Sequence, residues 1–169
     1  MNNNFFALFD LPISFDTDKT LLKEKFLALQ KQYHPDNTAG DDRQSALINH
    51  AFNMLYRDDN RAIHLLQLSG HDINLTNSIN DLDFLDEMMD IRIRLDECDD
   101  KADLLILLDE VDTFIKRTAQ SFCQSYKAQD WDNAKAFAQK LQFLGKLQDD
   151  VQDKLMHQAN NDSDDDLYV

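Results

Sequence analysis

The chain has 169 residues, of which 32 are acidic and 17 are basic, so its formal net charge is −15. A surface this negative repels phosphate backbones, which excludes nucleic acid as an expected partner. Hydrophobic residues make up 43% of the chain, and only three Gly and two Pro interrupt it. This composition supports a packed core and favours helices, so we predict a folded, all-α protein.

The first long amphipathic helix is expected over residues 20–33, immediately before the tripeptide His34-Pro35-Asp36. Its apolar residues, which recur at spacings of four, three and four, are Leu22, Phe26, Leu29 and Tyr33. Pro35 lacks an amide hydrogen and disfavours helical geometry at the residue before it. The helix is therefore expected to end near Tyr33.

Two more helices are expected in the first half, one ending near residue 56 and one over about 59–68. The turn after residue 33 carries an imidazole, a rigid ring and a carboxylate. It has no neighbouring nucleophile, no second carboxylate at a fixed distance and no metal-ligand spacing. We therefore predict a protein-binding surface here, in a protein that is not an enzyme.

This part of the chain resembles the J domain, the module with which co-chaperones stimulate DnaK-type ATPase chaperones. The resemblance is carried by Phe5, Phe6, Leu8, Leu11-Pro12, the segment 29–36, Ile48-Asn49-His50-Ala51-Phe52 and Leu55. The more specific resemblance is to the HscB family of iron–sulfur co-chaperones. It is carried by Arg61-Ala62, Leu65-Leu66, Gly70 and the segment 140–144, and in total it covers residues 4–157.

The resemblance implies that the tripeptide docks on a DnaK-type (HscA-like) ATPase chaperone. On the preceding helix, Lys23 and Gln30 share a flank beside the buried stripe, with Lys31 further round. We predict that this flank contacts an acidic patch of the chaperone, and the alternative is an ordinary solvated lysine flank. The predicted chaperone-binding residues are His34, Pro35, Asp36, Lys23, Gln30 and Lys31. Two positions depart from the family pattern, because Asn37 replaces a common lysine and Asp58 a common proline.

Charge is distributed unevenly along the chain. Residues 1–70 hold seven Lys and Arg against nine Asp and Glu, whereas residues 71–169 hold ten against twenty-three. The polar segment that follows Gly70 has the composition of a linker. We predict a J domain at 1–70, a linker at 71–80, a client-binding bundle at 81–158 and a disordered acidic tail at 159–169.

The bundle is expected to contain three antiparallel helices, over 81–98, 102–129 and 130–158. On the first of them one buried face is already complete with Phe84, Met88, Ile91 and Leu95. A second apolar strip then remains, formed by Leu82, Leu85, Met89 and Ile93. On the last helix Phe143 lies about 200° from Leu141, so it should point into water or towards the first helix.

Clustered exposed apolar groups mark a binding surface, unless the strip packs on the first half of the chain or the helices cross so as to bury two faces. In HscB-like proteins this region holds the iron–sulfur scaffold protein (IscU-like), and the resemblance implies the same here. The predicted scaffold-binding residues are Leu85, Asp86, Met89, Asp90, Ile93, Glu97 and Phe143. Asp86 stands where the family often has an apolar residue, and Ile93 where it often has an acid.

The implied function is that of a co-chaperone that delivers the scaffold protein to the chaperone and stimulates its ATPase. One alternative is a J-domain co-chaperone for a client unrelated to iron–sulfur clusters. Another is a small metal-dependent hydrolase using His64, His71 and Asp72.

The cysteines, Cys98 and Cys123, are isolated, so we expect no bound cluster, cofactor or metal. The apolar runs are too short to span a bilayer, and the N-terminal residues 1–4 show no export signal, which favours a cytoplasmic protein without a membrane segment.

Overall fold

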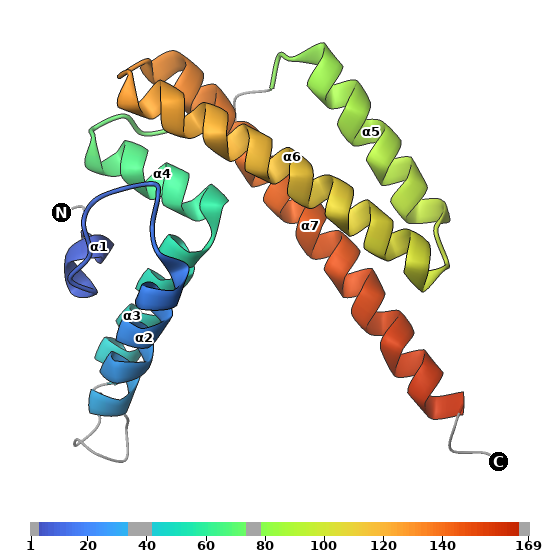
Figure 1. Ribbon diagram of the computed structural model, residues 1–169, viewed down its shortest axis with the longest axis horizontal. Helices are drawn as coiled ribbons and strands as arrows, with labels where there is room; N and C mark the ends of the chain where they lie inside the picture. Colours follow the sequence, from blue (N-terminus) through green and yellow to red (C-terminus); the bar gives the residue numbers. More distant parts are fainter. Residues whose placement is uncertain (1–3, 34–41, 74–78, 166–169) are drawn as a thin grey trace.

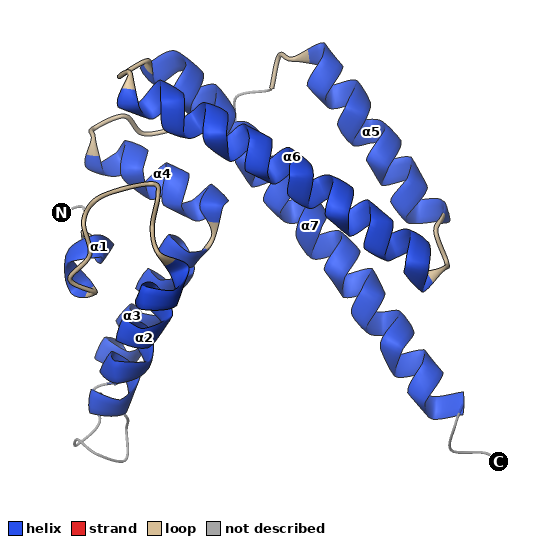
Figure 2. Ribbon diagram, viewed as in Figure 1, coloured by secondary structure: helices blue, strands red, loops and turns tan. Residues whose placement is uncertain are grey.

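The computed structural model describes residues 4–33, 42–73 and 79–165. In this part of the chain every regular element is a helix (Figure 2), which confirms the all-α prediction. The helices are α1 (Phe5–Leu8), α2 (Lys19–Gln32), α3 (Asp42–Tyr56), α4 (Asp58–Leu68), α5 (Leu82–Glu97), α6 (Lys101–Lys127) and α7 (Trp131–Asp165).

Helices α2 and α3 form a hairpin that projects from the rest of the molecule (Figure 1). Helix α2 begins where the Asp18 carboxylate accepts hydrogen bonds from two first-turn amides, and it ends at Gln32 with Tyr33 as its cap, as predicted. Stacking of Phe26 on Phe52, with ring centroids 4.1 Å apart, joins the two helices. An apolar contact between α2 and α3 thus helps to hold the hairpin together.

Helix α4 carries a buried arginine that ties several segments together. The Arg61 side chain, which is only 4% exposed, donates to the Phe15 carbonyl oxygen at 2.8 Å and to the Leu55 carbonyl oxygen at 2.6 Å. It also pairs with the Asp58 carboxylate at 2.6 Å. Its guanidinium lies 4.7 Å from the centroid of the Phe15 ring. Arg61 therefore holds α4 to the end of α3 and to the loop before α2.

We expect Arg61→Ala to lower the free energy of unfolding by about 3 to 5 kcal/mol, because it leaves buried acceptors without their donor. The matched control is Arg92→Ala, whose pair with Asp150 is nearly half exposed on both sides and contributes at most about 1 kcal/mol. Urea unfolding followed by circular dichroism measures both. Equal losses for the two variants would contradict the role given to Arg61.

Helices α6 and α7 form a long antiparallel hairpin that passes through two apolar cores (Figure 1). The first core joins α1–α4 to the turn end of this hairpin, which contributes Ala119, Phe122, Cys123, Ala134, Ala138 and Leu141. The second core joins α5 to the middle of the hairpin, with Leu104, Leu107, Val111, Leu144, Leu147 and Val151. The two halves of the chain thus share buried apolar surface, although the predicted linker separates them in sequence.

A polar contact reinforces the junction of the two halves. Arg57, just before α4, bonds to the Asp59 carboxylate at 3.1 Å and to the Asp149 carboxylate of α7 at 2.7 Å. These hydrogen bonds raise the pKa of Arg57. Gly145 of α7 lies directly beneath, where a Cβ atom would collide with the Asp59 carboxylate and come within 2.8 Å of the guanidinium. The absence of a side chain at Gly145 thus allows α4 to approach α7 this closely.

Helix α7 is longer than predicted. Its backbone stays helical to Asp165, so the predicted end at residue 158 is too early. This stretch contains no glycine or proline, so nothing in it forces the helix to stop, and its polarity removes only the signal of a buried face. The predicted acidic tail therefore overlaps this helix, and residues 166–169 lie outside the described residues.

Candidate functional site

The predicted chaperone-binding tripeptide, His34-Pro35-Asp36, lies outside the described residues. The structure does describe the helices on either side of it. The end of α2 and the start of α3 form the tip of the hairpin, at the end away from α4 and from the α6/α7 hairpin (Figure 1).

The predicted contacts on α2 differ in their surroundings. Lys23 and Lys31 are exposed, whereas Gln30 is half-buried. The Gln30 side-chain amide donates to the Asn49 side-chain oxygen on α3 at 2.9 Å. Gln30 therefore also holds the hairpin together, which its position on the helical wheel does not reveal.

The apolar strip predicted on α5 is exposed. The face of α5 that packs on the α6/α7 hairpin contains Phe84, Met88, Ile91 and Leu95, as predicted. On the other side Leu82 is 74% exposed, Met89 is 65% exposed and Ile93 is 49% exposed. Leu85 is half-buried at the edge of the second core. The alternative in which the strip packs against the first half of the chain is therefore wrong.

Phe143 of α7 faces α5, one of the two orientations expected for it. Its ring meets the Phe84 ring edge to face, with centroids 6.0 Å apart, and it is half-buried against the second core. The Arg92 guanidinium lies 5.7 Å from the centroid of the Phe143 ring. Phe143 and the α5 strip thus lie on the same flank of the bundle.

Charged side chains surround the apolar strip. Asp86, Asp90 and Glu97 are exposed on α5. Asp90 pairs with Arg94 at 3.1 Å. Arg92 was missed by the sequence analysis, although its position beside Leu85 on the helical wheel could have revealed it. Arg92 thus adds a cation to the mainly acidic edge of the apolar strip.

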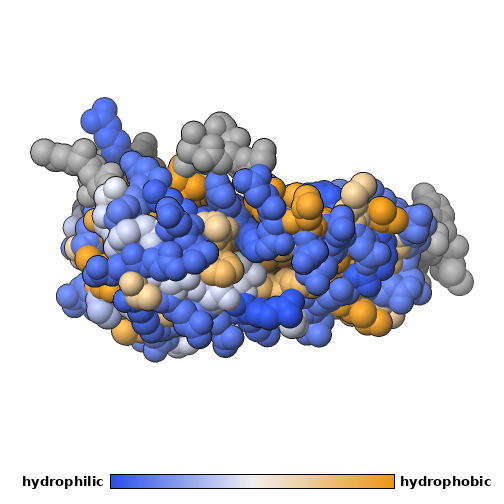
Figure 3. Space-filling model, turned by 90° about the horizontal axis from the view of Figure 1, so that it is seen from above, coloured by the Kyte–Doolittle hydropathy of each residue, from blue (hydrophilic) through white to orange (hydrophobic). Residues whose placement is uncertain are grey.

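Apolar groups gather on this part of the molecule. Figure 3 views the surface from above, where hydrophilic residues predominate and apolar side chains form several groups among them. At the start of α6, Leu105 and Ile106 are 52% and 65% exposed. Exposed apolar side chains that cluster are typical of a protein-binding surface.

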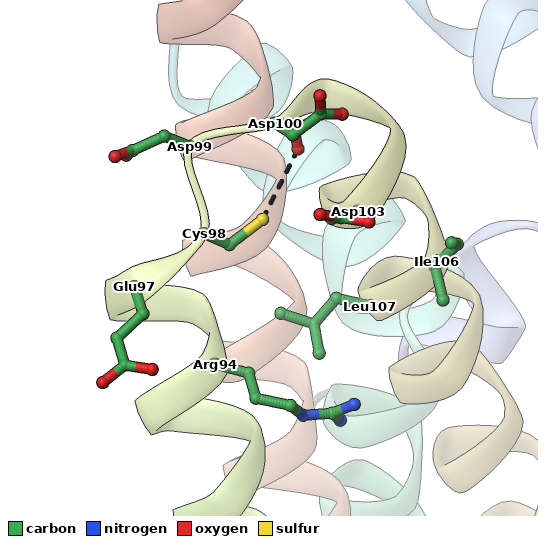
Figure 4. Close-up of a pocket in the computed structure, with 8 residues that line it drawn as sticks. All are labelled: Arg94, Glu97, Cys98, Asp99, Asp100, Asp103, Ile106 and Leu107. Atoms are coloured by element: carbon green, nitrogen blue, oxygen red, sulfur yellow. Dashed lines mark hydrogen bonds between the residues drawn. The ribbon is translucent and has the colours of Figure 1, made fainter.

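A pocket of about 400 Å³ opens where α5 ends and α6 begins (Figure 4). Glu97 from the predicted set lines it, together with Arg94 and Asp103. The Cys98 thiol beside them donates to the Asp100 carbonyl oxygen at 3.4 Å. The pocket extends the acidic edge of the apolar strip around the end of α5.

Comparison with known proteins bears on these surfaces. A family model described as the HSCB C-terminal oligomerisation domain matches residues 80–152. A relative from Acinetobacter baumannii (strain SDF), named co-chaperone protein HscB homolog, is 38% identical over 164 residues, which cover 95% of each chain. The chain belongs to the HscB co-chaperone family. The resemblance seen in the sequence is thereby confirmed.

Solved HscB structures share the fold. Chaperone HscB from Vibrio cholerae is 32% identical with a TM-score of 0.72, over 89% of this chain and 96% of that one. The human co-chaperone protein HscB is 25% identical with a TM-score of 0.76, over 90% of this chain and 82% of that one. The two-part helical architecture is thus that of the HscB family.

One departure from the HscB pattern has a structural role. Asp58, at the position of a common proline, pairs with Arg61 and, at 3.0 Å, with Lys19 at the start of α2. Burial raises the pKa of Asp58, but the attraction of Arg61 and Lys19 outweighs it, so the pKa lies below its usual value. Asp58 therefore stays ionised and links α4 to α2.

The hydrolase alternative is not supported by the described residues. His64 is buried, and its Nε2 accepts a hydrogen bond from the Phe5 amide at 3.2 Å. Burial lowers the pKa of His64. His71 stacks on Trp131 with ring centroids 4.1 Å apart. Among the described residues no group of three or more His, Cys, Asp or Glu side chains is placed to hold a metal ion.

None of the helices, within the residues the structure describes, has the length and apolar character required to cross a bilayer.

Proposed function

We propose that this protein delivers an iron–sulfur scaffold protein (IscU-like) to a DnaK-type (HscA-like) ATPase chaperone and stimulates the ATPase of that chaperone. The observation that carries the proposal is the exposed apolar strip on α5, continued by Phe143, on a part of the molecule remote from the α2/α3 hairpin. Two separate faces suit a protein that holds two partners at once. Residues 1–70 form the chaperone-binding unit, and residues 81–158 form the scaffold-binding unit.

The chaperone-binding face consists of the α2 flank and the tripeptide after it. The exposed cations Lys23 and Lys31 suit an acidic surface and accelerate association at low salt. His34, Pro35 and Asp36 follow this helix in the sequence and supply hydrogen-bonding groups. Stimulation requires that these residues bind the hydrolysis-prone state of the chaperone better than its resting state.

The scaffold-binding face consists of the α5 strip and Phe143. Burying Leu85, Met89 and Ile93 contributes about 1.5 to 3 kcal/mol for each side chain that becomes fully covered, before the cost of association is subtracted. That range suits micromolar binding with ready release. The acidic groups around the strip, Asp86, Asp90 and Glu97, favour a scaffold surface that is apolar at its centre and basic at its edge.

Coupling between the two faces follows from their attachment to one folded chain. A scaffold bound to the bundle is held near the chaperone that engages the hairpin, so its effective concentration there rises. The buried core that joins the two halves keeps the faces at a fixed separation. The protein itself is proposed to perform no catalysis and to hold no cofactor, and its cytoplasmic location remains a prediction.

The test is a steady-state ATPase assay of a DnaK-type chaperone with this protein alone, with the scaffold alone and with both. We expect stimulation by this protein, and a larger stimulation when scaffold and protein are present together. Failure of the protein to stimulate would contradict the proposal. Stimulation that the scaffold does not alter, with no scaffold binding in a direct titration, would favour a co-chaperone for another client.

A further inference from the structure

The outer face of α2 carries an exposed leucine between two lysines. Leu27 is 53% exposed, while Leu22 fills the buried side of the same helix. At 3.6 residues per turn, Leu27 lies about 40° around the helix from Lys23 and about 40° from Lys31. Both lysines are exposed. An apolar side chain therefore stands at the centre of a basic strip.

Packing within the described part of the chain does not account for Leu27. Its neighbours Phe26 and Leu29 pack against the core of this half, and Leu27 is not among the side chains that do so. Gln30, on the same flank, is engaged by Asn49 of α3. Leu27 is thus the apolar side chain of this flank that a partner can reach.

The charge around Leu27 indicates the chemistry of that partner. Helix α2 contains four lysines and one glutamate in a chain whose net charge is −15. The two lysines beside Leu27, Lys23 and Lys31, are both exposed. This local basic character, on an otherwise acidic protein, complements an acidic surface.

We propose that Leu27 is the apolar anchor of the α2 face and enters an apolar recess on an acidic surface of the ATPase chaperone. The inference rests on the proposed function, which names that chaperone as the partner. Lys23 and Lys31 attract and orient the chaperone, and burial of Leu27 lengthens the life of the complex. An apolar centre within a polar rim is the common arrangement of a protein interface.

The test compares wild type, Leu27→Gln and Leu27→Met in the ATPase assay, with each protein titrated into the chaperone. We expect Leu27→Gln to raise the half-maximal concentration about five- to tenfold and to leave the maximal stimulation unchanged. Leu27→Met keeps an apolar side chain of similar size and should remain within about twofold of wild type. The matched control is Met156→Gln on α7, where the methionine is 59% exposed, and it should not alter the titration.

The salt dependence of the titration distinguishes the contribution of Leu27 to binding from that of the lysines around it. Raising the salt concentration should shrink the effect of Lys23→Gln, because screening weakens charge attraction, and should leave the fold-loss of Leu27→Gln unchanged. A Leu27→Gln titration equal to that of Met156→Gln would overturn the inference, as would equal losses for Leu27→Gln and Leu27→Met. No stimulation by wild type would instead remove the proposed function on which the inference depends.

Discussion

His34→Gln should reduce stimulation of the chaperone ATPase to the rate of the chaperone alone, while scaffold binding stays at the wild-type level. Helix α2 ends at Gln32 with Tyr33 as its cap, so a substitution at position 34 should not alter the packing of α2. The substitution removes the imidazole from the group that we propose distinguishes the two states of the chaperone. A partner without differential affinity shifts no equilibrium, however well it binds.

The matched control for this prediction is His157→Gln, at an exposed position on α7 far along the chain from the hairpin. It should stimulate as wild type does. Steady-state phosphate release measures the ATPase, and fluorescence anisotropy with labelled scaffold measures binding. Full stimulation by His34→Gln, or a loss of scaffold binding in the same variant, would contradict the separation of the two faces.

Most of the helical architecture could be predicted because it depends on local periodicity. Phe84, Met88, Ile91 and Leu95 recur at helical spacing, and all four are buried. The end of α2 followed from the chemistry of Pro35, which has no amide hydrogen and constrains its predecessor. Elements of this kind carry their own signal, whichever neighbour they pack against.

Contacts between distant segments could not be predicted in the same way. The carbonyl groups that Arg61 binds come from Phe15 and Leu55, and their approach depends on how α4 crosses α3. In the sequence, Gly145 is only a residue that lowers helix stability. The structure shows that the Arg57–Asp59 pair occupies the space that a side chain at position 145 would need. Tertiary packing determines which groups make such contacts, and the periodicity of one helix does not reveal it.

The two candidate faces differ in how far the structure supports them. On α5 the second apolar strip was an excess of hydrophobic residues on a helix that already had a buried face, and Met89 and Ile93 are indeed exposed. On α2 the helical-wheel positions identified the charged residues but not Leu27, because a single leucine outside the buried stripe does not recur at helical spacing. Its significance depends on exposure, which only the folded hairpin reveals.

Phe143→Ala should weaken scaffold binding about 10- to 100-fold and leave stimulation of the chaperone by this protein alone unchanged. The Phe143 ring packs edge to face on Phe84 of α5, and the Arg92 guanidinium lies 5.7 Å from its centroid. Truncation removes the aromatic surface that continues the α5 strip, and it leaves the Arg92 guanidinium without its ring. Aromatic anchors at the centre of an interface commonly cost more than 2 kcal/mol when they are truncated.

Phe137→Ala separates this effect from a loss of folding, because Phe137 is also half-buried on α7 but packs against the first core. Both truncations should cost unfolding free energy of the same order, about 1 to 3 kcal/mol, and only Phe143→Ala should weaken the scaffold. Phe143→Leu should recover part of the affinity, since it restores an apolar side chain over Phe84. Equal scaffold affinities for Phe143→Ala and Phe137→Ala would mean that the scaffold binds elsewhere on the protein. A loss of affinity in Phe143→Ala alone would mean that the exposed strip of α5 and the aromatic ring of α7 belong to one binding surface.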